Sequence, residues 1–335
     1  MPMTHVHDTH ESTSMATRIA TLAIVVIPFL GLVAAMILLW GRGFHWLELG
    51  LFATMYTATG LGVTLGFHRL FTHRSYHTVR PIEMTLAVLG SMSAEGPLLH
   101  WCADHRRHHK HSDGERDPHS PHGFGEGVKG VLMGFWHSHM GWLFTYRGPN
   151  VQRYVPDLAH DPALKRISDW FVLWVLLGLA LPAAAGGLIT QSWMGALMGL
   201  LWGGLVRLFM VHHLTWSINS VCHLWGDRPY RSNDESRNNV LFGIVAFGEG
   251  WHNNHHAFPA SARHGLSWWQ LDLTYLVIRA LALLGLAWRI NLPSPEARRA
   301  KAMPCCGRTP PRDRVRPTGT APALAPHAVR PRPAP

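Results

Sequence analysis

The stretch that decides the fold is WLELGLFATMYTATGLGVTLGFHRLFTH, residues 46–73. Its first 22 residues are apolar apart from Glu48, and as a helix they are long enough to cross the ~30 Å hydrocarbon core of a bilayer. Two histidines, His68 and His73, follow directly. An apolar span that ends in a histidine pair predicts a site at the edge of a membrane.

Three further runs have the composition of membrane spans, at residues 19–40, 170–189 and 193–216. A signal peptide is the alternative for the first run, but that run is long and no clear cleavage site follows it. Short turns join 19–40 to 46–67, and 170–189 to 193–216. The sequence therefore predicts an all-α integral membrane protein whose four spans form two transmembrane hairpins.

The distribution of charge predicts which way these hairpins face. Residues 68–169 carry 12 Lys or Arg, whereas the two hairpin turns carry one, Arg42. Because cytoplasmic loops are enriched in Lys and Arg, we expect both termini and a helical cap, 68–169 and 217–303, on the cytoplasmic side. The net charge of +10 lies on no basic helix with interleaved aromatics, so we expect a lipid bilayer and not nucleic acid as partner.

Composition also sets the limits of the membrane domain. Residues 1–18 are polar and predict a flexible lead-in, which leaves 19–303 for the domain itself. Residues 304–335 are rich in Pro, Arg and Ala, which is typical of disorder. Cys305 and Cys306 at its start are candidates for acylation, although two ordinary thiols are the commoner case.

Three features inside the domain allow more than one interpretation. Residues 81–99 predict a partly buried or interfacial helix. Residues 267–290 predict an amphipathic helix at the membrane surface, with a fifth span as the alternative. Arg207 interrupts the fourth span, and it is either part of a functional site or paired for structural reasons.

Histidine is the residue type that points to chemistry, with 25 in 335 residues. In HRRHH (105–109) and HNNHH (252–256), the spacing i, i+3, i+4 places three imidazoles on one helix face. In HRLFTH (68–73), a spacing of five puts the two rings ~140° apart on a regular helix, so a bend or helix end is needed. The candidate metal ligands are His68, His73, His105, His108, His109, His252, His255 and His256.

Eight imidazoles exceed the four ligands of structural zinc and suit two metal ions. Imidazole also binds iron, copper and nickel, so ligand type alone does not choose the metal. The location beside apolar spans favours chemistry on a lipid chain, and removing hydrogen from an unactivated methylene needs an iron–oxygen oxidant. We therefore expect two iron ions with O2 as co-substrate. A membrane metal transporter is the alternative, but it predicts histidines within the spans.

The three boxes, with the context GEGWHNNHHAFP (248–259), resemble those of membrane fatty acyl desaturases, particularly the stearoyl-CoA (delta-9) desaturase group. The resemblance covers residues 46–290. It implies a cis double bond, at delta-9, in a fatty acyl substrate such as acyl-CoA. A di-iron hydroxylase or other monooxygenase shares such boxes and is the alternative. No His-Pro-Gly-Gly signature of a fused cytochrome b5 occurs, so a separate donor is expected: a ferredoxin, cytochrome b5 or an NAD(P)H-dependent reductase.

The resemblance adds site residues that spacing does not identify. In WSINSVCHLWG (216–226), it implies that His223 is a ninth histidine ligand and that Asn219 reaches iron through water. It also implies that Trp216 lines the substrate path. Ala103 stands where animal acyl-CoA members have an arginine for the headgroup, so carrier protein or phospholipid substrates stay open.

Three more residues are candidates for substrate contact. Arg147 is expected to keep part of a basic headgroup site. The resemblance also implies a tunnel for the acyl chain between the spans. Phe52 and Tyr56 share one face of the second span and would end a tunnel that reached them, unless they are ordinary packing residues. Metal-bound imidazoles also need acceptors for their other N–H, and the candidates are Asp104, Asp113, Asp234 and Glu249.

Overall fold

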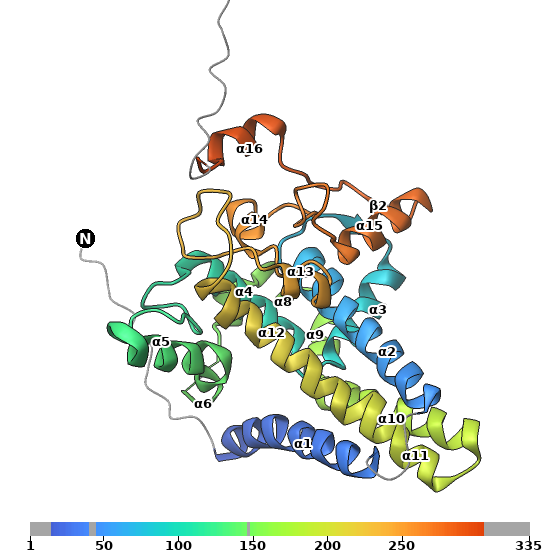
Figure 1. Cartoon of the computed structure of the whole chain (residues 1–335). Coiled ribbons are helices and arrows are strands. Elements are labelled where there is room, and N and C mark those ends of the chain that lie inside the picture. Colours follow the sequence, from blue (N-terminus) through green and yellow to red (C-terminus); the bar gives the residue numbers. More distant parts are fainter. Residues whose placement is uncertain (1–14, 40–44, 146–147, 305–335) are drawn as a thin grey trace, which may run out of the picture. The chain divides into compact units, whose positions relative to one another are not determined.

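Helices dominate the part of the chain that the computed structural model describes, residues 15–39, 45–145 and 148–304. Residues 1–303 form one unit and 304–335 a second, and the fold described below is that of the first. Arg147, Cys305 and Cys306 lie outside the described residues. The expected all-α class is confirmed for the described residues (Figure 1).

Segments marked η are π-helical, and the two short strands pair with each other antiparallel. In chain order the elements are α1 (Met15–Leu39), α2 (Trp46–Leu61), η1 (Gly62–Thr72), β1 (His77–Thr78), α3 (Arg80–Ser91), α4 (Leu98–His111), α5 (Gly127–Trp136), η2 (His137–Gly141), α6 (Trp142–Thr145), α7 (Val151–Tyr154), α8 (Pro156–Ala159), α9 (Pro162–Asp169), α10 (Phe171–Thr190), α11 (Trp193–Gly199), η3 (Leu200–Val206), α12 (Arg207–Leu224), α13 (Val240–Val245), α14 (His252–Ala257), α15 (Leu273–Leu283), β2 (Ala287–Trp288) and α16 (Pro295–Lys301).

Four continuous helices in the described residues are long and apolar enough to cross a membrane. They are Arg18–Leu39, Trp46–Thr72, Phe171–Thr190 and Trp193–Leu224. The second and fourth extend beyond the predicted ends at residues 67 and 216, because helical backbone continues into the polar sequence that follows each apolar run. As a result, these two helices run from the apolar region directly into the candidate site.

The long helices pack closely, and α10 and α11 lie side by side, joined by a tight turn (Figure 1). Gln191 ends α10 in a left-handed conformation, and the Ser192 hydroxyl accepts a hydrogen bond from the Gly195 N–H to begin α11. Gly186 permits the close approach, since a Cβ there would lie 2.2 Å from the carbonyl oxygen of Gly195. Helix α1 packs against η3 and α12.

Three expected boundaries were wrong. Helix α1 begins at Met15, inside the stretch expected to be a flexible lead-in. The single helix predicted over 81–99 is two helices, because Ala94 and Gly96 have positive φ angles and Pro97 precedes α4. The helix predicted over 267–290 is only Leu273–Leu283, because Gly285 has a φ of 72° and β2 follows.

Arg207 has a structural role, which resolves the two interpretations of its position. Its side chain is completely buried, and its two Nη atoms each donate to a carbonyl oxygen, of Met92 and of Gly178, at 2.7 Å. Its Nε donates to the Gly203 carbonyl at 3.2 Å. The guanidinium thereby joins α10, the end of α3 and the η3–α12 helix at one point.

Replacing this guanidinium should destabilise the protein. Arg207→Met would leave buried carbonyls without donors, at a cost of about 3 kcal/mol in the free energy of unfolding. We expect a lower Tm for detergent-solubilised protein, measured by differential scanning fluorimetry. Arg279→Met, which changes an exposed arginine on α15, is the matched control and should leave the Tm unchanged. Equal Tm values for the two variants would contradict the structural role of Arg207.

Candidate metal centre

The first histidine pair is brought together by π-helical backbone. In η1 the chain makes wider turns, and the N–H of His73 donates to the carbonyl oxygen of His68, five residues earlier, at 3.1 Å. With these wider turns, two residues five positions apart lie on the same side of the helix. The bend that the sequence required is therefore a change of helix type, and the two imidazole rings lie 4.9 Å apart, centroid to centroid.

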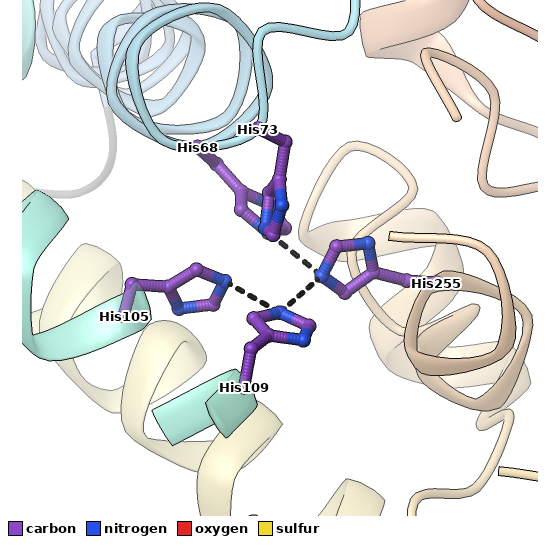
Figure 2. A group of neighbouring side chains, drawn as sticks. All are labelled: His68, His73, His105, His109 and His255. Carbon is purple, nitrogen blue, oxygen red and sulfur yellow. Dashed lines mark hydrogen bonds between the residues drawn. The ribbon is translucent and has the colours of Figure 1, made fainter. Parts of the chain in front are cut away.

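The nine candidate histidines form two groups, and each group takes residues from more than one box. Within each group, one ligand nitrogen per residue lies within 4.8 Å of all the others. The first group contains His68, His73, His105, His109 and His255 (Figure 2). The second group contains His108, His223, His252 and His256.

The i, i+3, i+4 spacing is used differently from the prediction. On α4, His105 and His109 point to the first group while His108 points to the second. On α14, His255 joins the first group, and His252 and His256 join the second. Each of these helices thus lies between the groups and supplies both. On each helix, the two rings four residues apart share one group, and the ring three residues after the first of them joins the other group.

His223 reaches the second group from α12, with its Nε2 at 3.1 Å from Nε2 of His252. It is isolated in the sequence, so only the resemblance singled it out. Asn219 lies one turn earlier on α12 and faces the two cavities described below. Its water-mediated contact with a metal stays a prediction.

Four of the nine imidazoles are oriented by carboxylates at Nδ1. Asp117 accepts from His108 at 3.0 Å, Asp113 from His223 at 2.9 Å and Asp234 from His256 at 2.6 Å. Glu249 accepts from Nδ1 of His68. Three of the four predicted acceptors therefore hold candidate ligands. Asp117 was missed, because it lies in a loop and nothing in its spacing connects it with His108.

These contacts leave the other ring nitrogens without protons, so the donor set fits a cation. In a neutral imidazole that donates from Nδ1, Nε2 carries a lone pair. His108 and His256 both donate from Nδ1, yet their Nε2 atoms face each other at 3.3 Å. In the first group, Nε2 of His255 lies 3.0 Å from that of His68 and 2.8 Å from that of His109. Ring nitrogens that converge in this way fit a bound metal ion.

Burial favours the neutral, metal-binding form of five of the candidate rings. It lowers the pKa of His73, His105 and His109 well below the ordinary value, and neighbouring histidines lower it further. The same causes act on His252 and His255. Since metal ligation requires deprotonated imidazole, the site is prepared for a cation across the physiological pH range.

The carboxylates stay charged in spite of their burial. Burial raises the pKa of Asp113, but the hydrogen bond and charge of His223 outweigh it and bring that pKa to about 2. Burial also raises the pKa of Glu249, but the Arg69 guanidinium and the hydrogen bonds from Arg69 and His68 bring it below the ordinary value. These negative groups would partly balance the charge of cations bound by the two histidine groups.

One buried arginine fixes Glu249 in place. The Arg69 side chain has no exposed surface, and its Nη2 lies 3.1 Å from Glu249 Oε1. Its Nη1 lies 2.9 Å from Asp272 Oδ1 and donates to the Ala262 carbonyl oxygen at 2.7 Å. Asp272 also caps α15 by accepting from the Tyr275 N–H. Arg69 thus connects η1, the loop before α14 and the start of α15.

Two cavities meet beside the histidines. The first cavity is mostly apolar, encloses about 620 Å³ and extends from His68, His105 and His252 to Tyr56 and Phe247. The second cavity encloses about 1000 Å³. Its lining is more polar and includes Trp216. The two cavities share four lining residues at their junction, namely Trp101, His105, Thr215 and Asn219.

A carboxyl group fixes the shape of that junction. Glu95 accepts from Nε1 of Trp101 at 3.0 Å and from the Thr215 hydroxyl at 2.8 Å. Burial raises the pKa of Glu95 to about 7. Because Trp101 also stacks on His105, at 5.1 Å between ring centroids, the junction and the first histidine group are mechanically connected.

The two residues predicted to stop a tunnel have different positions. Tyr56 lines the inner end of the first cavity, and its hydroxyl donates to the Val245 carbonyl oxygen. Phe52 stacks on Tyr56 at 5.6 Å but packs against Leu201 and its neighbours, outside the cavity lining. Only Tyr56 faces the space, and Phe247, which sequence reasoning missed, lies beside it at 5.2 Å.

Several other histidines surround the two groups. His119 lies near Asp117, and His122 lies near the His223 carbonyl, at 3.2 Å. His264 is buried 3.2 Å from Arg69. Each of these three rings contacts a candidate ligand or a residue that holds one in place.

Comparison with known proteins identifies the family. The sequence profile described as fatty acid desaturase matches residues 44–290, which include all nine candidate histidines. The chain therefore belongs to the fatty acid desaturase family. Its members are known for di-iron sites, in keeping with the two histidine groups.

Relatives in this family act on different acyl carriers. The chain is 45% identical over 280 residues to the hex-5-enoyl-[acyl-carrier protein] acetylenase of Moorena producens, covering 83% of this chain and 87% of that protein. It is 40% identical over 270 residues to the sn-1 stearoyl-lipid 9-desaturase of Anabaena variabilis, covering 79% and 92%. It is 39% identical over 256 residues to the acyl-CoA C20 delta5-desaturase of Anemone leveillei, covering 75% and 76%.

Removing an orienting carboxylate should weaken metal binding without changing the ligands. Asp234→Asn replaces the acceptor that holds His256, and partners of this kind typically contribute ~10- to 100-fold in metal affinity. We expect one of two metal ions to be lost more readily to a competing chelator, as measured by elemental analysis. Asp161→Asn is the matched control, because Asp161 pairs with Arg80 and its amide equivalent still caps α9. Equal metal retention in both variants would show that Asp234 does not support the site.

Proposed function

We propose that this desaturase introduces a cis double bond, at delta-9, into a saturated fatty acyl chain. The reaction would consume O2, two electrons and two protons and release two molecules of water. One observation carries the proposal: the two histidine groups lie where an apolar cavity and a more polar cavity meet. An acyl chain that enters through the polar cavity and fills the apolar one would place a middle methylene pair beside the metals.

The membrane arrangement is part of the same proposal. The four apolar helices would cross the bilayer as two hairpins within a domain of residues 19–303, with the histidine groups in a cytoplasmic cap. The excess of Lys and Arg in 68–169 supports this orientation. Both termini, including the Pro/Arg-rich segment 304–335, would then be cytoplasmic.

Two iron ions are the proposed cofactor, one in each histidine group. Bound there with O2, they would supply the oxidant that removes hydrogen from unactivated methylenes. The protein's own contribution is to hold nine imidazoles, orient four of them by carboxylates and keep Asn219 beside them for a water-mediated contact. The apolar cavity excludes water and holds the far end of the chain, while Trp101 and Thr215 fix the bend at the junction.

The headgroup is the least constrained part of the substrate. Relatives act on carrier-protein, lipid and CoA esters according to their names. Ala103, at the position of the arginine expected in animal acyl-CoA members, is completely buried and reaches no headgroup. Acyl-CoA, the initial expectation, thus loses one supporting contact, and Arg147 remains a proposed contact for any of the three headgroups.

The acetylenase among the relatives supports a second candidate reaction. An acetylenase removes two hydrogens from an existing double bond, so the same site would act on an unsaturated chain and form a triple bond. A hydroxylase differs in leaving an oxygen atom in the product. Mass spectrometry distinguishes the three products.

Expression in cells that lack their own desaturase tests the proposal. We expect a new cis-unsaturated ester when fatty acid methyl esters are analysed by gas chromatography and mass spectrometry. Purified iron-loaded protein, given an electron donor and stearoyl chains on CoA, carrier protein or lipid, then identifies the headgroup. His255→Ala and His108→Ala, one from each group, should abolish the product but still insert in membranes. A hydroxylated product, or none from iron-loaded protein, would contradict the proposal.

Chain length should depend on Tyr56 and not on Phe52. Tyr56→Ala opens the inner end of the apolar cavity, so chains longer by about two carbons should gain roughly tenfold in kcat/KM relative to the native length. Competition between acyl chains of different length, followed by product chromatography, measures this shift. Phe52→Ala is the matched control, because its ring stacks on Tyr56 without lining the cavity. An equal shift in both variants would place the end of the tunnel elsewhere.

A further inference from the structure

A group of positive side chains surrounds the end of α4, directly after the ligand His109. We define the basic cluster as Arg107, Lys110, Arg116 and Arg153. Lys110, Arg116 and Arg153 are exposed, and Arg107 is half-buried. Arg107 donates to the carbonyl oxygen of Arg116, and α7, which carries Arg153, packs against α4. The four side chains come from α4, the following loop and α7, so tertiary structure gathers them.

The cluster is not neutralised by carboxylates of the described residues. None of its four members forms an ion pair within that part of the chain, whereas Arg74, Arg80 and Arg106 all do. Arg107 donates to the Arg116 carbonyl oxygen at 3.0 Å, and Arg153 lies over the ring of Tyr154. These contacts fix the positions of the positive groups and leave their charge available to a partner.

A third cavity connects this cluster with both histidine groups. It is open to solvent and spans about 710 Å³ with that opening included, and its lining includes Lys110, His111 and Arg116. Its other lining residues include His109, from the first group, and Asp234, which holds His256 of the second group at 2.6 Å. The acids on its lining are Asp234, already committed to His256, and Glu115. From this cavity, each proposed metal is reached through one histidine or one carboxylate–histidine pair.

We propose that the basic cluster is the docking surface for a small acidic one-electron carrier protein, whose electrons enter through His109 and the Asp234–His256 pair. This inference rests on the proposed function, which requires two electrons per double bond. Each carrier molecule is oxidised by one electron at this surface, and two successive carriers supply one turnover. The two electrons, O2, two protons and the two hydrogens removed from the substrate are accounted for by two molecules of water.

Charge complementarity favours this kind of partner. Carriers must exchange quickly between reduction and delivery, and electrostatic steering raises association rates without requiring a large interface. Weak redox encounters typically bury less than about 1,200 Å². A compact surface of four positive groups above a short path to the metals suits such an encounter. An anionic lipid surface would also bind these charges, but lipid binding would not explain why the cluster lies beside a cavity lined by His109.

The test compares two triple variants in nanodiscs of neutral lipid. The first, Arg107→Gln, Lys110→Gln and Arg116→Gln, removes three charges from the basic cluster. The matched control, Lys129→Gln, Arg166→Gln and Arg289→Gln, removes three exposed charges elsewhere. The probes are a plant-type ferredoxin and a soluble cytochrome b5, both acidic. Their Kd is measured by biolayer interferometry at about 50 mM and about 300 mM salt, where screening differs strongly.

We expect native protein and control to bind at least one probe, with a Kd that rises with salt. The cluster variant should bind it about tenfold more weakly and with little salt dependence. With methyl viologen as a small reductant, which needs no docking surface, all three proteins should be reduced and active alike. Donor-supported reduction of the bound iron, followed by absorbance, should be slow in the cluster variant alone.

Three outcomes would overturn the inference. The first is that neither probe binds native protein. The second is that both triple variants lose affinity equally. The third is that the cluster variant loses only its binding to anionic vesicles. The last result would identify a lipid-binding surface. Failure of the proposed function is recognised separately, because carrier affinity and iron reduction are measured without any acyl product. A protein that binds and accepts electrons but forms no double bond would retain the docking surface and lose the desaturase assignment.

Discussion

Nine buried or half-buried imidazoles, with ring nitrogens that face one another at about 3 Å, are the constraint on which this structure depends. Neutral rings whose Nδ1 atoms donate to carboxylates cannot hydrogen-bond to each other through Nε2. Protonating them instead would bury several like charges, which burial opposes. Bound metal cations would resolve this conflict, and the surrounding carboxylates would balance their charge. The fold therefore has to bring four helical segments, η1, α4, α12 and α14, to one place and to hold them there.

The helices meet this requirement through their geometry and through buried polar anchors. π-Helical backbone in η1 turns His68 and His73 to one side, and α4 and α14 each lie between the two histidine groups. Arg69 connects η1 to the start of α15 through Glu249 and Asp272, and Arg207 joins the long helices through three carbonyl oxygens. Both guanidiniums are completely buried, so these contacts are costly to break. They hold the two histidine groups in a fixed position relative to the apolar helices.

The same arrangement places the two cavities proposed for the acyl chain and the basic cluster proposed for the electron carrier at different positions. The apolar cavity lies among the long helices, and the more polar cavity opens from the junction at Trp101 and Thr215. The basic cluster and its cavity lie at the far end of α4, beyond His109. Acyl chain and electrons would thus reach the histidine groups from different directions. α4 carries residues that line all three cavities, from Trp101 at the junction to Lys110 in the basic cluster.

The sequence by itself determined the helical class, the four long apolar segments and eight of the nine clustered histidines, because apolar length and i, i+3, i+4 spacing are local properties. The family resemblance added His223, which local spacing leaves isolated. Only the tertiary structure decided how the boxes divide into two groups, since that depends on how α4 and α14 are placed against η1 and α12. It also decided that Asp117 holds His108, that Tyr56 faces a cavity while Phe52 does not, and that Arg207 is structural. These are contacts between residues distant in the sequence or in loops, and no periodicity encodes them.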